Sequence, residues 1–292
     1  MAHKQLRFLG VVAAAMILTM ACGGSSGGPP AKTFKIGLVT DIGGLNDKSF
    51  NHLADVGLEK AKTDFKVQGD VKESKSGDDY VPNLTDFATK KYDLVIGVGF
   101  LMQEAVGTVS GQFPDIHFAI IDGAGTDAKG VDLKHPNVQS LYFKEQDAGA
   151  MVGVMAGWME KNGKAKKNKH VIGAVGGISI PPVDDYIAGL GVLQQAGQSG
   201  VYSIGVDADQ KDADPSVIAS ALKKVDVATY TAIKNVVNNQ FQAGALTFSI
   251  ANEGAGYSVD NFTVPPELQA ELDKVLGQIK SGALTPPADI PA

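Results

Sequence analysis

Short apolar runs of strand length alternate with segments that carry apolar residues at helical spacing over the first half of the chain. The expected strands are residues 34–40, 67–73, 93–99 and 116–122, and the expected helices are 48–65, 79–90 and 101–112. Alternating strands and helices predict a parallel sheet with helices on both faces. Because such sheets bind ligands beyond the carboxyl ends of their strands, the loops after these strands are the expected binding region.

The second half of the chain continues this alternation less regularly. The expected strands are 138–143, 169–176 and 202–207, with one or two return strands at 247–250 and 257–260, and the expected helices are 145–162, 184–196, 215–237 and 266–281. Pro215 suits the first turn of the helix predicted for 215–237, and Gly282 suits the end of the last helix. The pattern therefore predicts an α/β protein throughout.

The N-terminus has the pattern of a bacterial lipoprotein signal. Lys4 and Arg7 precede the 14-residue apolar stretch 8–21, which is shorter than the roughly 20 residues of a membrane-spanning helix. Cys22, the single cysteine of the chain, follows at once and is expected to carry a lipid after cleavage, and the Gly/Ser/Pro-rich segment 22–33 is expected to be a flexible tether. The alternative interpretation is a short N-terminal membrane anchor, and with one cysteine no disulfide can form.

Charge and missing motifs exclude several classes of function. Removal of the predicted signal peptide, residues 1–21, would delete Lys4 and Arg7 and change the net charge from −6 to −8, which argues against a nucleic-acid partner. The sequence has no phosphate-binding GxxxxGK[ST] loop and no GxSxG elbow. Its five histidines lie far apart, and residues 207–214 fail the EF-hand spacing, so neither a metal site nor a cofactor is expected.

Three aspartates occupy the same place relative to predicted strands. Asp41, Asp122 and Asp207 each follow a short apolar strand, where side chains face the ligand crevice of a parallel sheet. The alternative is that each aspartate only caps the next helix. Because all three share this placement, we favour the binding-site interpretation.

The segment VTDIGGLNDKSFN, residues 39–51, carries the most chemical information. Its paired glycines allow a tight turn with close backbone approach. Asp47 or Ser49 can cap the helix that follows. Phe50 lies in the first turn of that helix, where its ring could stack on a planar ligand; core packing is the alternative.

Four segments in order, namely VTDIGGLNDKSFN (39–51), FAIIDG (118–123), GGISIPPVDDYIAG (176–189) and IGVDADQ (204–210), carry a resemblance that spans nearly the whole mature chain. They resemble the basic-membrane-lipoprotein family, purine-nucleoside-receptor-like binding lipoproteins that serve ABC importers. The resemblance implies two doubly wound parallel-sheet lobes joined by a hinge, a periplasmic-binding-protein-like fold of type I. The first lobe would comprise residues 34–143 and about 245–284, the second lobe 144–244, and the tail 285–292.

The resemblance also gives roles to residues at the base end of a nucleoside. Asp41 and Asp122 look like the carboxylates that bind the base. Phe50 looks like one half of an aromatic clamp around the purine, and Asn51 is expected beside it among the ligand-binding residues.

At the sugar end, the resemblance makes Asp207 the carboxylate that accepts hydrogen bonds from ribose hydroxyls. Lys223 looks like its basic partner, with the neighbouring Lys224 as the alternative. Vicinal hydroxyls donate well to a carboxylate, and such charge-assisted bonds are strong. A surface Lys–Asp pair of little energetic weight is the competing interpretation of Lys223.

The chain departs from the family pattern near residues 189–191. Residues 186–189 (YIAG) run almost directly into 190–194 (LGVLQ), where the family continues with further helices and strands. About one and a half βα units, roughly 45 residues, are therefore expected to be absent. The second aromatic of the clamp and two strands of the second lobe belong to this piece, so we expect a truncated second lobe with an exposed sheet edge.

These observations lead to a lipid-anchored receptor on the extracytoplasmic face of the cell membrane. It would be a monomer that captures a nucleoside, with a purine base, for the permease and ATPase subunits of an ABC importer. A sugar- or polyol-binding receptor of the same fold, or a binding-defective deletion variant, is the alternative. An enzyme that uses Asp41 or Asp122 as a general acid is disfavoured, because no second carboxylate or histidine has a recognisable catalytic spacing.

Overall fold

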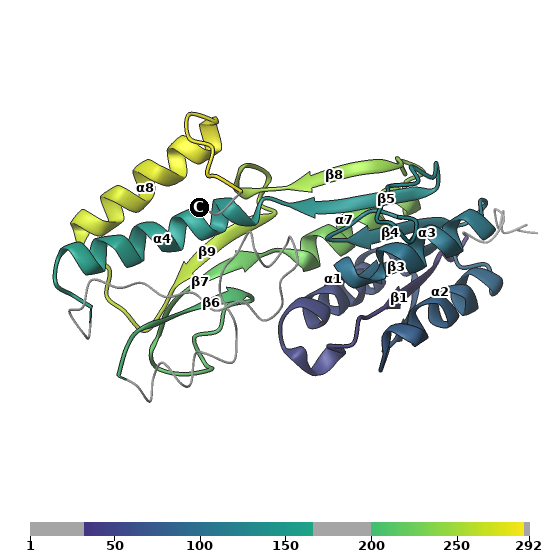
Figure 1. The fold of residues 1–292 in the computed structure, drawn as a ribbon, viewed down its shortest axis with the longest axis horizontal. Helices are drawn as coiled ribbons and strands as arrows, with labels where there is room; N and C mark the ends of the chain where they lie inside the picture. The colour runs from purple at the N-terminus through teal and green to yellow at the C-terminus, as the bar shows by residue number, and fades with distance from the viewer. Residues whose placement is uncertain (1–31, 166–199, 289–292) are drawn as a thin grey trace, which may run out of the picture. The chain divides into compact units, whose positions relative to one another are not determined.

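The computed structural model describes residues 32–165 and 200–288, and the strands in this part of the chain form two sheets (Figure 1). The first sheet has six parallel strands in the order β2-β1-β3-β4-β5-β8. The strands are β1 (Lys35–Val39), β2 (Gln68–Lys72), β3 (Leu94–Val98), β4 (His117–Ile121), β5 (Val138–Phe143) and β8 (Gly244–Phe248). The α/β class with a parallel sheet, predicted from the sequence, is confirmed.

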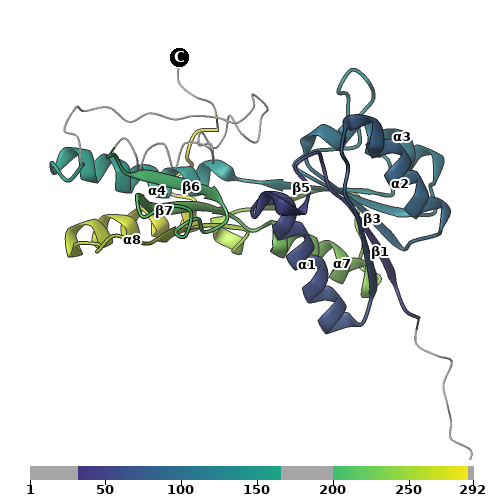
Figure 2. The same ribbon diagram turned by 90° about the horizontal axis from the view of Figure 1, so that it is seen from below.

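Helices cover both faces of this sheet (Figure 2). One face packs against α1 (Phe50–Phe65) and α7 (Val225–Val237), and the other against α2 (Tyr80–Thr89) and α3 (Gln103–Gln112). Neighbouring residues of a strand point to opposite faces, so Ile96 of β3 joins the α1/α7 core and Val95 joins the α2/α3 core. The buried run along β3 is the pattern of a strand covered on both faces.

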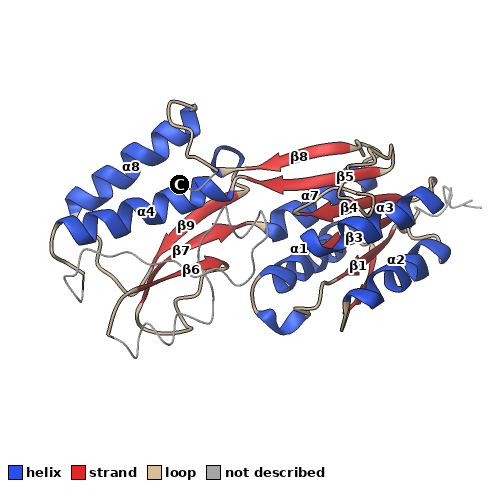
Figure 3. Ribbon diagram, in the orientation of Figure 1, coloured by secondary structure: helices blue, strands red, loops and turns tan. Residues whose placement is uncertain are grey.

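The second sheet has three strands in the order β6-β7-β9 (Figure 3). These are β6 (Ser203–Asp207), β7 (Val217–Lys223) and β9 (Ala255–Val259); β6 and β7 are parallel and β9 is antiparallel to β7. Helices α4 (Glu145–Lys161) and α8 (Pro266–Ser281) pack against it. The predicted last helix is confirmed, and it ends at Gly282 with the left-handed backbone expected there.

The predicted helix 215–237 is wrong over its first part. Residues Val217–Lys223 form strand β7, and the helix begins only at Val225. The run VIASAL is buried between β6 and β9, so its sheet neighbours override a spacing that fits a helix equally well. Lys223 therefore lies at the carboxyl end of a strand, and Pro215 lies in the turn before that strand.

The expected lobe boundaries are corrected in two places. Helix α7, assigned to the second lobe as part of 144–244, packs against the first sheet. Strand β9 and helix α8, assigned to the first lobe as part of 245–284, pack in the core of the second sheet. Each sheet needs its buried face covered, and here elements distant in sequence cover it. The predicted strand 169–176 and helix 184–196 lie outside the described residues.

Within the described ranges, the chain passes between the two cores at three places, and hydrogen bonds join these places. The backbone N–H of Lys144, between β5 and α4, donates to the carbonyl of Phe248 at the end of β8. The N–H of Lys224, between β7 and α7, donates to the carbonyl of Gly254 before β9. The crossing segments are thus hydrogen-bonded to one another. This arrangement is compatible with the hinge that the family resemblance implies.

A side chain forms hydrogen bonds with the backbone of β6 next to Asp207. The Gln210 amide donates to the carbonyl of Val206 at 2.8 Å and accepts from its N–H at 3.3 Å. The Gln210 N–H donates to the hydroxyl of Ser220 on β7 at 3.1 Å. A Cβ at Gly205 would lie 2.8 Å from the Gln210 side chain, so glycine there leaves room for this arrangement.

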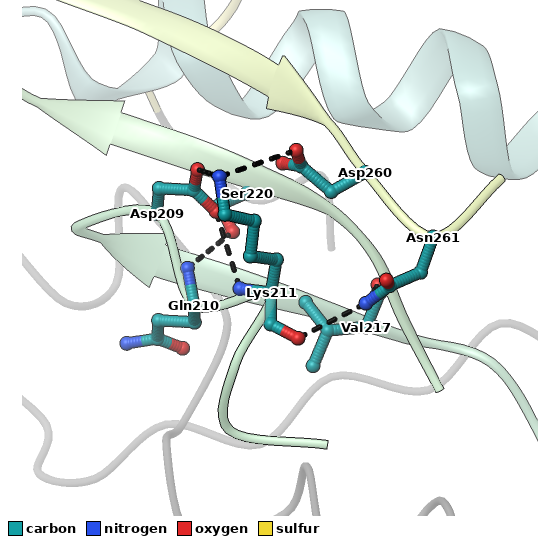
Figure 4. A network of polar contacts seen from close by, with 7 residues as sticks. All are labelled: Asp209, Gln210, Lys211, Val217, Ser220, Asp260 and Asn261. Atoms are coloured by element: carbon teal, nitrogen blue, oxygen red, sulfur yellow. Dashed lines mark hydrogen bonds and ion pairs between the residues drawn. The ribbon is translucent and has the colours of Figure 1, made fainter. Parts of the chain in front are cut away.

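The loop after β6 is also held at its far end (Figure 4). The Lys211 ammonium lies 3.2 Å from Asp209 and 3.9 Å from Asp260, which follows β9. The Asn261 amide donates to the carbonyls of Lys211 and Val217. These contacts bind the 208–216 loop to β7 and β9 and so fix the end of β6 that carries Asp207.

Candidate functional site

Lys223, at the carboxyl end of β7, lies between two buried carboxylates. Its Nζ is 2.5 Å from Oδ2 of Asp122 and 2.7 Å from Oε1 of Glu145. The three side chains are at most 6% exposed. The contact joins residues about a hundred positions apart, so it is a product of the tertiary fold, and it is no surface pair.

Two of the predicted aspartates share an unusual backbone conformation at matching positions. Asp122 directly follows β4 with φ of 65°, and Asp207 ends β6 with φ of 66°. The left-handed region is uncommon for residues with a side chain, although aspartate tolerates it better than most. Strain of this kind gathers at functional sites because the surrounding structure has to maintain it.

The carboxylate of Asp122 has one oxygen in use and one without a partner. Oδ2 accepts from Lys223, while Oδ1 is buried and has no hydrogen-bond partner among the described residues. A buried carboxylate oxygen without a donor is costly, so this atom marks a place where a bound molecule could donate. The alternative interpretation of Asp122 as a helix cap does not agree with this pairing.

Within residues 32–165 and 200–288, the cluster contains more acid than base. Asp122, Glu145 and Asp207 surround the single cation of Lys223. Burial raises the pKa of Asp122 to about 7; Lys223 opposes this rise and Glu145 adds to it. Burial also raises the pKa of Asp207, again opposed by Lys223. Burial alone would lower the pKa of Lys223, but the carboxylates of Asp122, Glu145 and Asp207 outweigh it and raise that pKa.

Two aromatic rings flank the same ammonium group. The Nζ of Lys223 lies 5.3 Å from the ring centroid of Phe50 and 4.8 Å from that of Phe143. Both distances are within the range of cation–π attraction. Phe50, the first residue of α1, is only half-buried, so its ring is held at the site without being enclosed in the core.

A network of hydrogen bonds fixes Asp41 in the loop after β1. Its Oδ1 accepts from the N–H of Gly43 and from the Asn51 amide, both at 2.8 Å. The Asn51 Oδ1 in turn accepts from the Asp41 N–H at 3.2 Å. A Cβ at Gly99, after β3, would lie 3.0 Å from Asp41 and 3.5 Å from Phe50, so both side chains lie against this glycine.

The beginning of α1 is capped by Asp47. Its carboxylate accepts from the backbone N–H groups of Ser49, Asn51 and His52. Ser49, the other cap candidate, makes no capping hydrogen bond with its side chain. The cap holds the first turn of α1, and thereby Phe50 and Asn51, in place.

The two candidate lysines differ in burial, and two residues that the sequence did not suggest lie in the cluster. Lys223 is buried and paired, whereas Lys224 is half-buried at the N-terminus of α7. Glu145 and Phe143 were not among the binding residues predicted from the sequence. Glu145 comes two residues after the end of β5, so the rule that selected Asp122 would also have found it.

Some expectations cannot be placed in this structure. Cys22 and the DDYIAG segment lie outside the described residues. Within residues 32–165 and 200–288, no group of histidine, cysteine or acidic side chains is arranged to hold a metal ion. In the same part of the chain, no helix combines the length and the hydropathy of a membrane span.

Comparison with known proteins gives a consistent result. The model of the Bmp family, ABC transporter substrate-binding proteins of the PnrA-like type, matches residues 34–190 and 186–285. A CD4+ T-cell-stimulating antigen of Listeria monocytogenes is 32% identical over 94% of this chain and 83% of its own length. An uncharacterised lipoprotein of Pyrococcus furiosus is 30% identical over 76% of this chain and 69% of its own.

Basic membrane protein A of Borreliella burgdorferi is 26% identical over 94% of this chain and 93% of its own. Among solved structures, a solute-binding protein of an ABC transporter system from Aeropyrum pernix superposes with a TM-score of 0.72 at 24% identity, covering 88% of this chain and 94% of its own. This likeness supports the periplasmic-binding-protein-like fold.

The alignments also reveal a difference in length. The alignment with the Listeria monocytogenes protein extends over 313 positions. It includes 94% of the 292 residues of this chain, which is about 274 residues. About 39 aligned positions therefore have no residue in this chain. The two matches to the family model meet at residues 186–190.

Proposed function

This chain belongs to the Bmp family of PnrA-like ABC transporter substrate-binding proteins, and from that premise we propose that its ligand is a nucleoside with a purine base. Proteins of this family bind a substrate for import and are not enzymes. The observation that carries the proposal is the convergence of Phe50, Asp122, Asp207 and Lys223, four of the six predicted residues, around one buried ammonium group.

The chemistry of these residues suits the two ends of a nucleoside. The half-buried ring of Phe50 offers a face to a planar base, and Asp41 lies beside it against Gly99. The carboxylates of Asp122 and Asp207 can accept from ring N–H groups and ribose hydroxyls. We propose that Asn51, whose amide is bonded to Asp41, serves the ligand by orienting that carboxylate.

A sugar or polyol could also donate to these carboxylates, but it would leave the ring of Phe50 without a planar partner. The aromatic residue therefore favours a nucleoside over a sugar. A panel of nucleosides competing against free sugars separates the two ligand classes.

The cellular setting follows from the family and from the relatives. Lipoproteins among the relatives support lipid attachment at Cys22, which would hold the protein on the extracytoplasmic face of the membrane. The partners of a family member are the permease and ATPase of its importer. We propose that the protein is a monomer and delivers its ligand to that permease.

The internal deletion near residues 189–191 bears directly on affinity. It is supported by the aligned positions that have no residue here and by the family matches that meet at 186–190. The missing piece would carry the second ring of the clamp, so Phe50 would stack on the base alone. A receptor with half a clamp would bind more weakly than its relatives, because one stacking contact is lost.

A thermal melt of the purified protein with and without nucleosides tests the proposal. A ligand that binds only the folded state adds about 2.7 kcal/mol at a hundredfold excess over its dissociation constant. We expect inosine, guanosine or adenosine to raise the midpoint and ribose to leave it unchanged. A cooperative melt that none of the nucleosides moves would contradict the proposal.

Replacement of Phe50 by leucine should weaken binding selectively. Loss of the stacking face is expected to reduce nucleoside affinity by about 1–3 kcal/mol while an apolar side chain remains in place. Isothermal titration of the variant against the wild-type protein measures this difference. Equal affinities would mean that Phe50 only packs in the core, and Leu101→Ala, an exposed apolar residue after β3, serves as the control.

A further inference from the structure

We propose that Glu145 is a positioning residue that holds the Lys223 ammonium against Asp122 and, without contacting the ligand, makes ligand capture release a proton from Asp122. This inference rests on the proposed function, because it assumes that a ligand enters the cluster around Lys223. The contacts that carry it are the two carboxylates on one ammonium, at 2.5 Å and 2.7 Å.

Glu145 reaches Lys223 from a different element than the other acids do. It is the first residue of α4, where the N-terminus of the helix favours a negative charge. Its side chain is 4% exposed and its carboxylate faces the ammonium group. A carboxylate placed in this way can orient the Lys223 ammonium group.

The charge balance of the cluster makes a proton on Asp122 favourable. Among the described residues, the charged groups that act on Asp122 are Lys223 from β7, Glu145 from α4 and Asp207 from β6. One cation cannot neutralise the two buried carboxylates of Asp122 and Glu145 and the half-buried carboxylate of Asp207, and like charges in such a site disfavour ionisation of one of them. In agreement with this, burial and the negative charge of Glu145 raise the pKa of Asp122 to about 7, although the positive charge of Lys223 lowers it.

The unpartnered oxygen of Asp122 couples this proton to the ligand. Its Oδ1 is buried without a hydrogen-bond partner among the described residues. A hydroxyl or N–H group of the ligand that donates to Oδ1 stabilises the ionised carboxylate, so the proton leaves as the ligand binds. With Asp122 half-protonated near pH 7, the apparent dissociation constant should be about tenfold larger at about pH 6 than at about pH 8.

Glu145→Gln removes the negative charge but keeps a group of similar size that can accept from Lys223. The pKa of Asp122 should then fall, because the repulsion from Glu145 is gone. The pH dependence of binding should therefore shift to lower pH and flatten between about pH 6 and about pH 8. Glu145→Asp keeps the charge and should restore the wild-type profile.

Asp147→Asn is the matched control. Asp147 also lies in the first turn of α4 and is buried, but its carboxylate accepts from the N–H of Ile250 and makes no contact with Lys223. Its replacement should leave the pH profile of binding unchanged. A shift as large as that of Glu145→Gln would make the effect a general consequence of perturbing α4 and would overturn the proposal.

The experiment is titration calorimetry with adenosine between about pH 5.5 and about pH 8 in buffers of different ionisation enthalpy, which counts released protons. Release of a proton near neutral pH by the wild-type protein, reduced in Glu145→Gln, supports the proposal. No proton release by a wild-type protein that binds adenosine overturns it, even if Glu145→Gln fails to fold.

Melting without ligand separates this inference from the proposed function. An acid whose pKa is raised on folding binds more protons in the folded state, so its contribution to stability falls as pH rises from about 4 to about 7. This fall should be smaller in Glu145→Gln than in the wild-type protein. Asp147→Asn is a control for binding only, because burial also raises the pKa of Asp147 and its removal changes the fall in stability by itself. A protein that binds no nucleoside but shows this difference refutes the nucleoside proposal alone; identical melting profiles refute the role of Glu145.

Discussion

Replacement of Lys223 by methionine is expected to lower the free energy of unfolding by about 3–5 kcal/mol at neutral pH. The change leaves the buried carboxylates of Asp122 and Glu145 without their cation. Removing one partner of a buried ion pair is far costlier than the net value of the pair, because an uncompensated charge stays behind. Urea unfolding at about pH 7 measures the loss, and the variant should also bind no nucleoside.

The neighbouring lysine provides the control for this substitution. Lys224 is half-buried at the N-terminus of α7, and its backbone N–H, which bonds to Gly254, survives a change of side chain. Lys224→Met should therefore alter stability by no more than about 0.5 kcal/mol. The loss in Lys223→Met should shrink at about pH 5, where Asp122, whose pKa burial raises, takes up a proton. Equal stabilities of the two variants would contradict the buried cluster.

Replacement of Gly57 by alanine is expected to destabilise the protein by about 1–3 kcal/mol, although alanine is the better helix former. A Cβ at Gly57 would lie 2.4 Å from the backbone carbonyl oxygen of Asp226 and 2.8 Å from Cβ of Thr229. Backbone atoms cannot move aside cheaply, so α1 would have to separate from α7. Since α1 begins with Phe50, nucleoside affinity should fall with stability.

A second helical glycine separates the effect of crowding from that of helix propensity. Gly153 lies in α4, is exposed, and has nothing within 4 Å of the position of a Cβ. Gly153→Ala should therefore stabilise the protein by about 0.5–1 kcal/mol. Because α1 and α7 approach closely at Gly57, thermal melts should show a lower midpoint for Gly57→Ala and a higher midpoint for Gly153→Ala. Stabilisation by Gly57→Ala would show that the helices pack less tightly than described.

The first sheet could be predicted almost completely, because most of its first five strands are short apolar runs followed by a loop, β2 (QGDVK) being the weaker exception. Alternation of buried strands with helices allows few other topologies. The segment 217–237 could not be divided correctly from its pattern. An apolar run of seven residues followed by a helix resembles one long helix, and only the neighbours β6 and β9 favour a strand.

The candidate site was predictable where the strand-end rule applies. The rule placed Asp122 and Asp207 on matching strand ends, and the resemblance added Lys223. The ion pairs of Lys223 could not be predicted from the sequence, because no pattern indicates that Glu145 and Asp122 contact the same ammonium group. Nor could spacing indicate the left-handed backbone at Asp122, whose N–H donates to the carbonyl of Leu141 on the neighbouring strand.

The interleaved order of elements has a consequence for synthesis of the chain. The six-stranded sheet is complete only when α7 and β8 have been made, and both come after two strands of the other sheet. A ribosome that has reached residue 224 has produced five of the six strands and none of the helix that covers α1. The apolar face of α1 around Leu58 then lacks its cover, so the first core should close late, and a nascent chain halted before Phe248 should be a substrate for chaperones and proteases.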